Sequence, residues 1–328
     1  MIEQIRIFHS TSTDPYFNIA TEKQLLETVD TNCSILYLWQ NQNTVVIGRN
    51  QNPWAECRTS LLEDEGGHLA RRLSGGGAVF HDLGNLNFTF IMHDADYDVD
   101  KQLSVIQTAC AGLGITAERS GRNDLLADGQ KFSGNAFYHS QGKAYHHGTL
   151  LVQANMEKLS HYLTPSKAKL EAKGVASVRS RVVNLSQLSP GLTCPLLADH
   201  MCHAFSQVYG LTPQNITLSP ADLTAIEESA KYLSSWEWLY GPRLPFSFAC
   251  EDRFPWGSIR LELQVESGII RAARVYTDAM DWQLSDRITT ALSNCRFCQE
   301  SIRNALLDTL NFDTIRKDIC NLLIRQAL

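Results

Sequence analysis

A run of three glycines follows two arginines closely, and these residue types together can bind an anion. Arg71 and Arg72 precede Gly75, Gly76 and Gly77. Successive glycines let the backbone approach a ligand and present N–H groups to it, while arginine can hold phosphate oxygens with two parallel hydrogen bonds. The run indicates a phosphate cradle, although a flexible glycine turn with solvated arginines has the same pattern. Its order excludes the GxxxxGK[ST] loop.

A second cluster places an aspartate and a lysine on either side of a short turn. Asp124 follows Gly121, and Lys131 follows Asp128 and Gly129. Hairpin geometry would bring Asp124 near Lys131. The lysine could then place a point charge on a carboxylate or phosphate, and the aspartate could hold Mg2+. Taken singly, each residue is more often an ordinary surface residue.

A third cluster joins two histidines to a small residue on an apolar strand. His146 and His147 are followed by Gly148 and Thr149. The glycine is expected to open space beside the strand, so that one histidine could orient a substrate. A lone histidine at a strand start is more often structural. No third ligand at metal spacing accompanies the pair, which argues against a metal site.

A basic segment between residues 167 and 181 is the fourth candidate. Gly174 interrupts it, and only Glu171 opposes its positive charges. Such a segment could close over an anion, and a solvated basic helix and turn would explain the pattern equally well.

Composition limits the class of protein. The chain has 328 residues, 44% of them hydrophobic and 20% charged, which is enough to bury one large core or two unequal ones. A net charge of -6 and a pI near 5.9 argue against a dedicated nucleic-acid binder. No apolar run reaches the roughly 20 residues of a membrane-spanning helix, and residues 1–10 lack a signal-peptide pattern, so we expect a cytoplasmic protein.

Cysteine usage indicates a reducing compartment. The 9 cysteines are an odd number in a chain too large to need disulfides, so we expect reduced thiols, most of them in the core. Only Cys295 and Cys298 form a CxxC. Without a second cysteine or histidine pair this is weak evidence for zinc, and we interpret the two as a buried helical pair.

The elements that would position these clusters alternate between helices and strands. Asp14 and Pro15 read as the N-cap and first residue of an amphipathic helix. Short apolar runs predict strands over 35–39, 44–47, 78–80, 86–92 and 145–152. The first two are predicted to form a hairpin. Helices are predicted over 103–113 and from about residue 156, without the regular βαβ spacing of a doubly wound sheet.

A smaller second domain is predicted beyond the linker-like stretch 242–245. Alternating apolar residues predict a β-hairpin over 259–276, and helical periodicity follows over 302–310 and 315–324. The predicted domains are residues 1–244 and 250–328.

In this order, the clusters resemble the motifs of the lipoate-protein ligase A family, within the biotin and lipoate protein ligase superfamily. The similar segments are 44–54, the RRxSGGGxVxHDxGN run of 71–85, 121–124, 131–136 and 147–151. Residues 172–185 resemble the family's adenylate-binding loop, which favours the anion-closing interpretation of the basic segment. The C-terminal part resembles, more loosely, the accessory domain of the large bacterial ligases.

The resemblance implies an α/β fold of the α+β type, with mixed sheets and flanking helices in a catalytic domain and a small α+β C-terminal domain. It implies an enzyme that uses ATP and Mg2+ to convert lipoate into lipoyl-AMP and then attaches the lipoyl group to a lysine. The expected acceptors are lipoyl domains of 2-oxo acid dehydrogenase acyltransferase subunits and the glycine cleavage H protein. A monomer is expected, with no nucleic-acid or membrane partner.

The resemblance also assigns residues. Lys131 is the expected catalytic residue, bridging the lipoate carboxylate and the α-phosphate, and Asp124 is the candidate Mg2+ ligand. The expected ATP- and lipoate-binding residues are Arg72, Gly75, Gly76, Gly77, Ala78, Val79, Phe80, Asp124, Lys131, His147, Gly148 and Thr149. The expected adenylate-binding loop contributes Lys173, Gly174, Ser177, Arg179 and Arg181.

Three alternatives compete with this assignment. An octanoyl transferase of the same fold acts through a cysteine in a Pro-Cys pair, whereas this chain has Pro165 and Ser166, and no cysteine between Cys110 and Cys194. A relative that transfers only a ready-made adenylate stays open. A nucleotide- or lipoate-binding protein without catalysis would not need Lys131.

Overall fold

The computed structural model describes residues 1–121, 123–163, 182–240, 248–266, 268–309 and 313–327. Its contacts divide the chain into two compact units. The first comprises Met1–Val46, Cys57–Arg71 and Val79–Leu239, and the second comprises Ile47–Glu56, Arg72–Ala78 and Tyr240–Leu328. Two N-terminal loops, one of them carrying the three glycines, therefore belong by their contacts to the unit formed by the C-terminal residues. The predicted boundary between 244 and 250 overlaps undescribed residues and stays a prediction.

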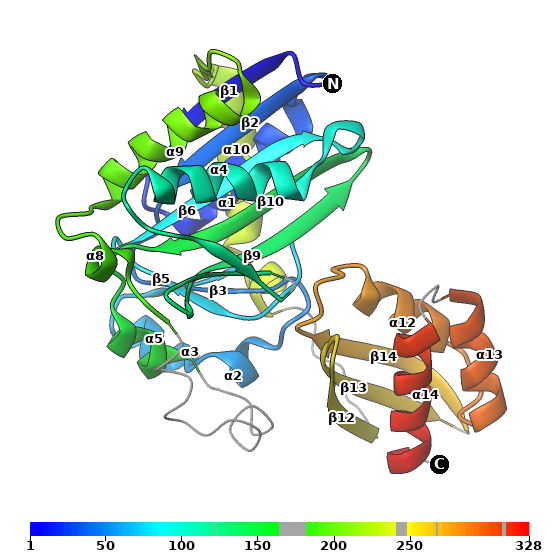
Figure 1. The fold of residues 1–328 in the computed structure, drawn as a ribbon. Helices are drawn as coiled ribbons and strands as arrows, with labels where there is room; N and C mark the ends of the chain where they lie inside the picture. Colours follow the sequence, from blue (N-terminus) through cyan, green and yellow to red (C-terminus); the bar gives the residue numbers. More distant parts are fainter. Residues whose placement is uncertain (122, 164–181, 241–247, 267, 310–312, 328) are drawn as a thin grey trace. The chain divides into compact units, whose positions relative to one another are not determined.

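An eight-stranded sheet forms the centre of the first unit, in the order β11-β1-β2-β6-β10-β9-β8-β7 (Figure 1). Its strands are β1 (Gln4–His9), β2 (Cys33–Trp39), β6 (Asn85–His93), β7 (Glu118–Ser120), β8 (Asp124–Ala127), β9 (Gln130–Ser140), β10 (Lys143–Leu151) and β11 (Gln214–Asn215). β1 pairs in parallel with β2 and β11, and the other neighbours pair antiparallel. The mixed sheet with flanking helices confirms the predicted fold class.

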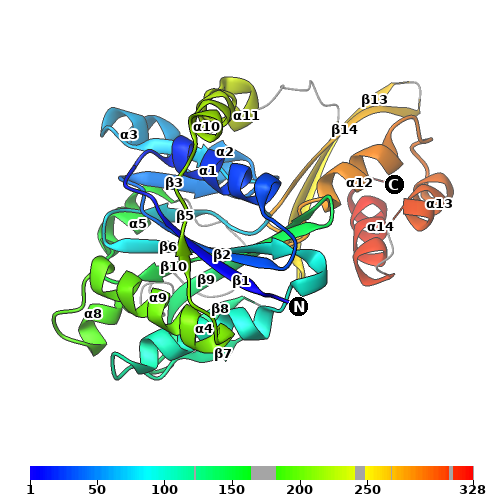
Figure 2. The ribbon, with the colours of Figure 1, turned by 90° about the horizontal axis from the view of Figure 1, so that it is seen from above.

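Helices cover both faces of this sheet (Figure 2). One face packs against α4 (Val99–Ala111) and α9 (Cys194–Tyr209), with Phe88 and Phe90 of β6 in the shared core. The other face meets α1 (Pro15–Thr28). The predicted cap of α1 is confirmed, because the Asp14 side chain accepts hydrogen bonds from the N–H groups of Tyr16 and Phe17. Both faces of the sheet are covered, so the alternate polar residues of β6 are buried as well.

A small sheet has the order β4-β3-β5, with β4 (His68–Arg71), β3 (Thr44–Ile47) and β5 (Val79–His81), and all of its residues except Ile47 belong to the first unit. The predicted hairpin of 35–39 with 44–47 is therefore wrong, because β2 and β3 lie in different sheets. β2 is buried at every position and pairs on both edges, with β1 and β6, which leaves no edge for β3. The other strands predicted here, β5 and β6, and the strand β10 are confirmed.

The remaining described helices of the N-terminal two thirds are shorter or lie at the rim. They are α2 (Pro53–Glu56), α3 (Thr59–Asp64), η1 (Asp94–Asp96), α5 (Met156–Tyr162), α8 (Leu185–Leu188), α10 (Pro220–Leu233) and α11 (Trp236–Tyr240). No helix among the described residues is long and apolar enough to cross a membrane.

The C-terminal residues form an antiparallel sheet with helices packed on it. The sheet consists of β12 (Phe248–Phe254), β13 (Gly257–Glu266) and β14 (Ile269–Thr277), and the helices are α12 (Leu284–Leu292), α13 (Gln299–Thr309) and α14 (Asp313–Ala327). Leu261, Ile288, Leu306 and Leu323 share its core. The predicted hairpin and the last two helices are confirmed, and β12 and α12 are additional.

All nine cysteines lie in described parts of the chain as free thiols, and six are buried, as predicted. The interpretation of Cys295 and Cys298 as a buried helical pair is wrong. The two residues lie in the loop between α12 and α13, where Cys295 is half-buried and Cys298 is exposed. Asn294, just before them, has a left-handed φ of 59°, which ends the preceding helix.

Candidate functional site

The hairpin of β8 and β9 brings Asp124 and Lys131 together, as predicted. Lys131 Nζ lies 2.7 Å from Asp124 Oδ1, and the two side chains are 35% and 36% exposed. The pairing register shifts beside the turn, at Leu125 and Leu126. A side chain at Gly134 would place its Cβ 3.1 Å from the ammonium, so glycine makes room for the lysine. The hairpin thus holds a cation at an accessible position.

Thr149 and Val183 also lie beside this lysine. Thr149 Oγ1 accepts a hydrogen bond from Gly134 N, and Val183 N donates to Lys131 O over 2.9 Å. The expected adenylate-loop residues Lys173, Gly174, Ser177, Arg179 and Arg181 lie outside the described residues. Residues 182 and 183, the first described after them, pair with β9 at Lys131 itself. Three predicted motifs therefore converge on Lys131.

Gly148 has a different role from the one predicted. A Cβ at this position would lie 2.6 Å from Gly134 O and 2.7 Å from the Phe88 ring. The interpretation that Gly148 opens space beside its strand is wrong, because neighbouring atoms fill that space. The glycine instead allows β9 and β10 to approach closely beside Gly134, whose N–H contacts the Thr149 hydroxyl.

Two asparagines fix the chain next to Asp124. Asn135 N and Asn135 Nδ2 both donate to Asn123 O, at 2.8 and 3.1 Å, and Asn123 Nδ2 donates to Asn135 O. Asn135 Oδ1 is in turn 2.8 Å from His146 Nε2. This chain of contacts ties the start of β8 to the buried strand β10.

His146 is a structural histidine. It is completely buried, and burial, together with the nearby positive charges of His147 and Arg119, lowers its pKa to about 3. The ring is therefore neutral near pH 7. Its Nδ1 lies 2.9 Å from Gln102 Oε1. A neutral ring has one N–H, so one neighbouring amide must turn its NH2 toward it.

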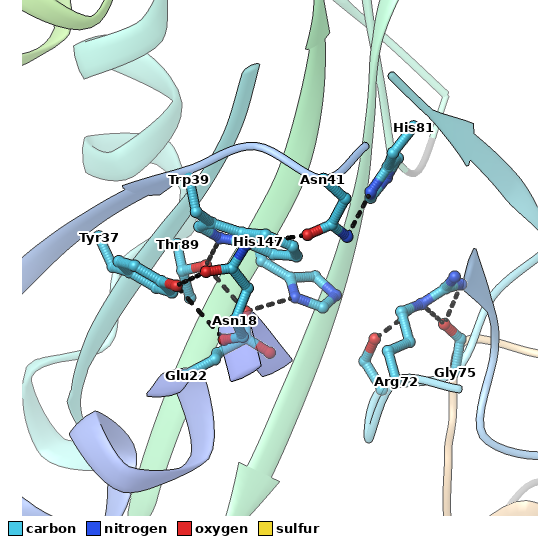
Figure 3. Close-up of polar contacts among 11 residues, drawn as sticks. Asn18, Glu22, Tyr37, Trp39, Asn41, Arg72, Gly75, His81, Thr89 and His147 are labelled. Carbon is cyan, nitrogen blue, oxygen red and sulfur yellow. Dashed lines mark hydrogen bonds and ion pairs between the residues drawn. The ribbon is translucent and has the colours of Figure 1, made fainter. Parts of the chain in front are cut away.

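His147 points to the opposite face of the strand, toward α1. Its Nδ1 lies 2.7 Å from Glu22 Oε1, which also accepts a hydrogen bond from Thr89, and Trp39 donates to the Thr89 hydroxyl (Figure 3). Glu22 is fully buried, and its Oε2 has no hydrogen-bond partner within the described part of the chain. A buried carboxylate oxygen without a donor is costly, so this cluster contains an unsatisfied acceptor among its described contacts.

Sequence reasoning missed Glu22, Thr89 and Trp39. A signal for Glu22 was present, since it lies three residues after Ile19 and four before Leu26, within the apolar stripe of α1. A charged residue inside such a stripe is either paired or functional. Thr89 gave no comparable signal, because its alternation with apolar residues suggested a solvent-facing position.

The cluster continues through amide side chains to the motif histidine His81. Asn18 accepts a hydrogen bond from the Tyr37 hydroxyl and donates to Asn41 Oδ1, and Asn41 Nδ2 lies 3.2 Å from His81 Nδ1 (Figure 3). These contacts join α1, β2 and β5. His81 therefore connects the small sheet to the buried polar layer under α1.

In the second unit, residues Arg72–Ala78 form a loop that we call the glycine loop. Arg72 is buried, and its guanidinium donates to the carbonyl oxygen of Gly75 (Figure 3). It also donates to Ser74 Oγ and to the carbonyl oxygen of Gly77. In the first unit, Arg71 donates to the carbonyl oxygens of Trp238 and Leu239. Both arginines thus hold protein carbonyl groups, and phosphate binding by Arg72 stays a prediction.

The three glycines differ in their surroundings. A Cβ on Gly75 would lie 2.4 Å from Ala279 O and 2.7 Å from Met280 O. Gly76 has a φ of 93°, which disfavours other residues, and its N–H donates to Ala279 O. Of the three, only Gly77 could carry a Cβ with no described atom within 4 Å of it. Gly75 and Gly76 are therefore required by the close packing and backbone conformation of the loop, whereas the space beside the Gly77 Cα is open.

The last three predicted residues of this motif lead into the small sheet. Ala78 and Val79 are half-buried, whereas Phe80 is buried on β5 and packs against the Tyr162 ring. No group of three or more His, Cys, Asp and Glu side chains among the described residues could hold a metal ion. Mg2+ binding by Asp124 therefore stays a prediction.

Comparison with known proteins identifies the family of the chain. The family model "Lipoyl protein ligase A/B catalytic domain" matches residues 14–206, and "Bacterial lipoate protein ligase C-terminus" matches residues 244–323. Proteins named lipoate-protein ligase A from Bdellovibrio bacteriovorus and Psychrobacter cryohalolentis are 40% and 42% identical, over 93% and 94% of this chain and 92% and 93% of theirs. The crystal structure of P. falciparum LipL1 in complex with lipoate is 27% identical and covers 98% of this chain and 99% of its own, with a TM-score of 0.85. The chain belongs to the lipoate-protein ligase A family.

Proposed function

We propose that this protein activates lipoate with ATP as lipoyl-AMP and then transfers the lipoyl group to a lysine of a lipoyl domain. The observation that carries the proposal is the accessible Lys131, held by Asp124 where the predicted motifs of β9, β10 and residues 182–183 converge. Family membership and the lipoate-bound relative support the same reaction.

In the first step, a lipoate carboxylate oxygen bonds to the α-phosphorus of ATP, and the bond to pyrophosphate breaks. Negative charge then gathers between the carboxylate and the α-phosphate. An ammonium at that position stabilises the charge of the transition state more strongly than the charge of the bound substrates. Lys131 fits the role because its partner Asp124 is half-exposed, so the ammonium can exchange that carboxylate for the substrate.

In the second step, the acceptor lysine amine attacks the acyl carbon, the bond to AMP breaks, and the amine loses a proton as the amide forms. The glycine loop is proposed to bind phosphate through the open backbone at Gly77. Arg72, whose fork holds the carbonyl groups of that loop, is proposed to maintain its shape.

The buried cluster under α1 is proposed to orient substrate through His147. Glu22 fixes the Nδ1 side of this ring, so that Nε2 has a defined direction. Mg2+ is proposed to neutralise charge on the ATP phosphates, with Asp124 as its protein ligand. This fits the general behaviour of Mg2+, which is often held by one or two carboxylates together with substrate phosphates.

The finer assignments rest on the family resemblance. The proposed acceptors are lipoyl domains of 2-oxo acid dehydrogenase acyltransferase subunits and the glycine cleavage H protein. The protein is proposed to act in the cytoplasm as a monomer.

The test is to incubate the protein with ATP, Mg2+, lipoate and an apo lipoyl domain and to weigh the acceptor. We expect the acceptor to gain one lipoyl group only when all components are present. A parallel reaction supplied with lipoyl-AMP and no ATP separates the two steps. Transfer from lipoyl-AMP without any activity on ATP and lipoate would contradict the ligase assignment and identify a transferase of ready-made adenylate.

A thiol control addresses the octanoyl transferase alternative. Alkylation of accessible thiols should leave lipoate adenylation largely intact, because Lys131, rather than a cysteine, is the proposed catalytic group. Complete loss of activity, prevented by prior incubation with an octanoyl donor, would favour a thioester mechanism.

A further inference from the structure

The loop between α12 and α13 holds the two cysteines of the CxxC in a tightly turned and well-anchored conformation. Cys298 N donates to Arg296 O over 2.8 Å, a contact across only two residues that reverses the chain direction. Cys295 Sγ lies 3.3 Å from the same carbonyl oxygen. The Cys295 thiol and the Cys298 backbone N–H therefore both contact the Arg296 carbonyl oxygen.

Strand β14 and the turn before it hold this loop in place. Asn294 N donates to Ile270 O, Ile270 N donates to Cys295 O, and Phe297 N donates to Gly268 O. The Phe297 ring also packs against Phe248. Backbone hydrogen bonds thus fix residues on each side of the turn, and the conformation of this loop is anchored to the sheet.

The two thiols have different surroundings. Cys298 is exposed and stands at the N-terminus of α13, where Ile302 N donates to its carbonyl and its Sγ lies 3.3 Å from Ser301 Oγ. Hydrogen bonds from the Ser301 hydroxyl and backbone lower the pKa of Cys298, with Arg296 assisting and Glu300 opposing. Burial, followed by the charge of Cys298, raises the pKa of Cys295.

We propose that Cys295 and Cys298 form a thiol–disulfide couple that reacts with low-molecular-weight disulfides, in which Cys298 is the attacking thiol and Cys295 the resolving thiol. An exposed thiolate at a helix N-terminus is the usual attacking group, and a neighbouring, more protected thiol is the usual resolving group. This reactivity is separate from lipoate ligation and needs no residue of the proposed ligase site.

The reaction balances with a disulfide R–S–S–R as the oxidant. The Cys298 thiolate attacks one sulfur, a mixed disulfide forms, and RS⁻ leaves and takes up a proton. Cys295, after losing its proton to solvent, attacks Cys298 Sγ, and the second RS⁻ leaves. The protein loses two electrons and two protons, and the oxidant becomes two thiols.

The experiment exposes the full-length protein to glutathione disulfide, stops the reaction with acid, and follows intact mass and cysteine-containing peptides. Wild type should lose two hydrogens and yield a peptide linked between Cys295 and Cys298. Cys295→Ser should instead accumulate one glutathionyl group on Cys298. Cys298→Ser should react at least about tenfold more slowly, since the thiol with the lowered pKa is gone.

Two controls keep the result interpretable. Serine is a favoured N-cap residue, so Cys298→Ser should retain α13 and melt near the wild-type temperature. Cys202→Ser removes a half-buried thiol whose pKa burial raises to about 11, and this variant should react at the wild-type rate. A Cys298→Ser variant as reactive as wild type, or a wild-type protein that retains the mixed disulfide without closing it, would overturn the proposal.

Discussion

Lys131 and Arg72 are cations in opposite kinds of environment. Arg72 is 7% exposed, and its fork donates to a hydroxyl and two carbonyl groups of the glycine loop. Lys131 is 35% exposed and forms an ion pair with Asp124. The planar guanidinium has a fixed set of donors that suits a fixed set of acceptors, whereas a compact ammonium on a flexible stem can change partners.

This difference separates the proposed roles of the two residues. A group that must meet substrate charge during a reaction should be able to leave its resting partner at little cost, as an exposed ion pair allows. A buried group with several hydrogen bonds is costly to displace. We therefore expect a change at Lys131 to alter the reaction rate and a change at Arg72 to alter the stability of the glycine loop.

The largest effect is expected from Lys131→Ala. Loss of an electrostatic contact in the transition state should lower the rate of lipoate-dependent ATP–pyrophosphate exchange by roughly a hundred- to thousandfold, or about 2.7–4 kcal/mol. The melting temperature should hardly change, because the lost ion pair is exposed. Arginine at this position should restore little activity, since its fork differs in shape from an ammonium.

Lys23→Ala is a matched control for this variant. Lys23 also forms an ion pair, with Glu27 at 2.8 Å, and is equally exposed at 35%. Its removal should leave exchange activity unchanged. If folded Lys131→Ala exchanged at a rate near that of Lys23→Ala, Lys131 would be an ordinary surface lysine.

The next largest effect concerns the backbone that Arg72 stabilises. Gly75→Ala would press a methyl group against the carbonyl oxygens of Ala279 and Met280, which are backbone atoms and cannot rotate away. We expect a loss of about 1–3 kcal/mol in the free energy of unfolding, measured by urea denaturation. Gly77→Ala, in the open position, should change it by less than about 0.5 kcal/mol. Equal stabilities would show that the loop can shift, contrary to its proposed rigidity.

A smaller effect is expected from Arg72→Lys. The charge is kept, but an ammonium cannot reach the Ser74 hydroxyl and both carbonyl groups in the same geometry, so about 1–2 kcal/mol of unfolding free energy should be lost. Arg271→Lys, at an exposed position on β14, serves as control and should be neutral within about 0.5 kcal/mol. Wild-type stability combined with a raised KM for ATP would indicate direct phosphate binding by Arg72 instead.

Local patterns predicted the parts of the site that lie within one hairpin or at one helix end. The short turn between Asp124 and Lys131 fixes their proximity, and the Asp14-Pro15 pair fixes the start of α1. These features depend on residues close in sequence. A local pattern was therefore enough to predict them.

Features that depend on contacts between residues far apart in the sequence were not predictable from local patterns. β2 and β3 look like a hairpin locally, but β6, far along the chain, takes the edge of β2. Glu22 meets His147 across more than a hundred residues, so its burial follows from how α1 packs on the sheet. Gly148 likewise faces Gly134 O only because β9 and β10 pair in this register.

The smallest effect on stability is expected from Asp124→Asn. This variant also tests whether Lys131 exchanges the Asp124 carboxylate for the substrate. The exposed ion pair with Lys131 contributes less than about 1 kcal/mol, so the variant should melt near the wild-type temperature. When Lys131 moves to the substrate, the Asp124 carboxylate is left without its cation, and a divalent ion bound to the ATP phosphates can replace it. We therefore expect Asp124→Asn to raise the Mg2+ concentration needed for half-maximal adenylation by roughly tenfold, which a Mg2+ titration of the exchange rate measures. An unchanged Mg2+ requirement with a reduced kcat would mean that Asp124 only orients Lys131, because removing a positioning carboxylate slows the reaction without altering the affinity for the metal.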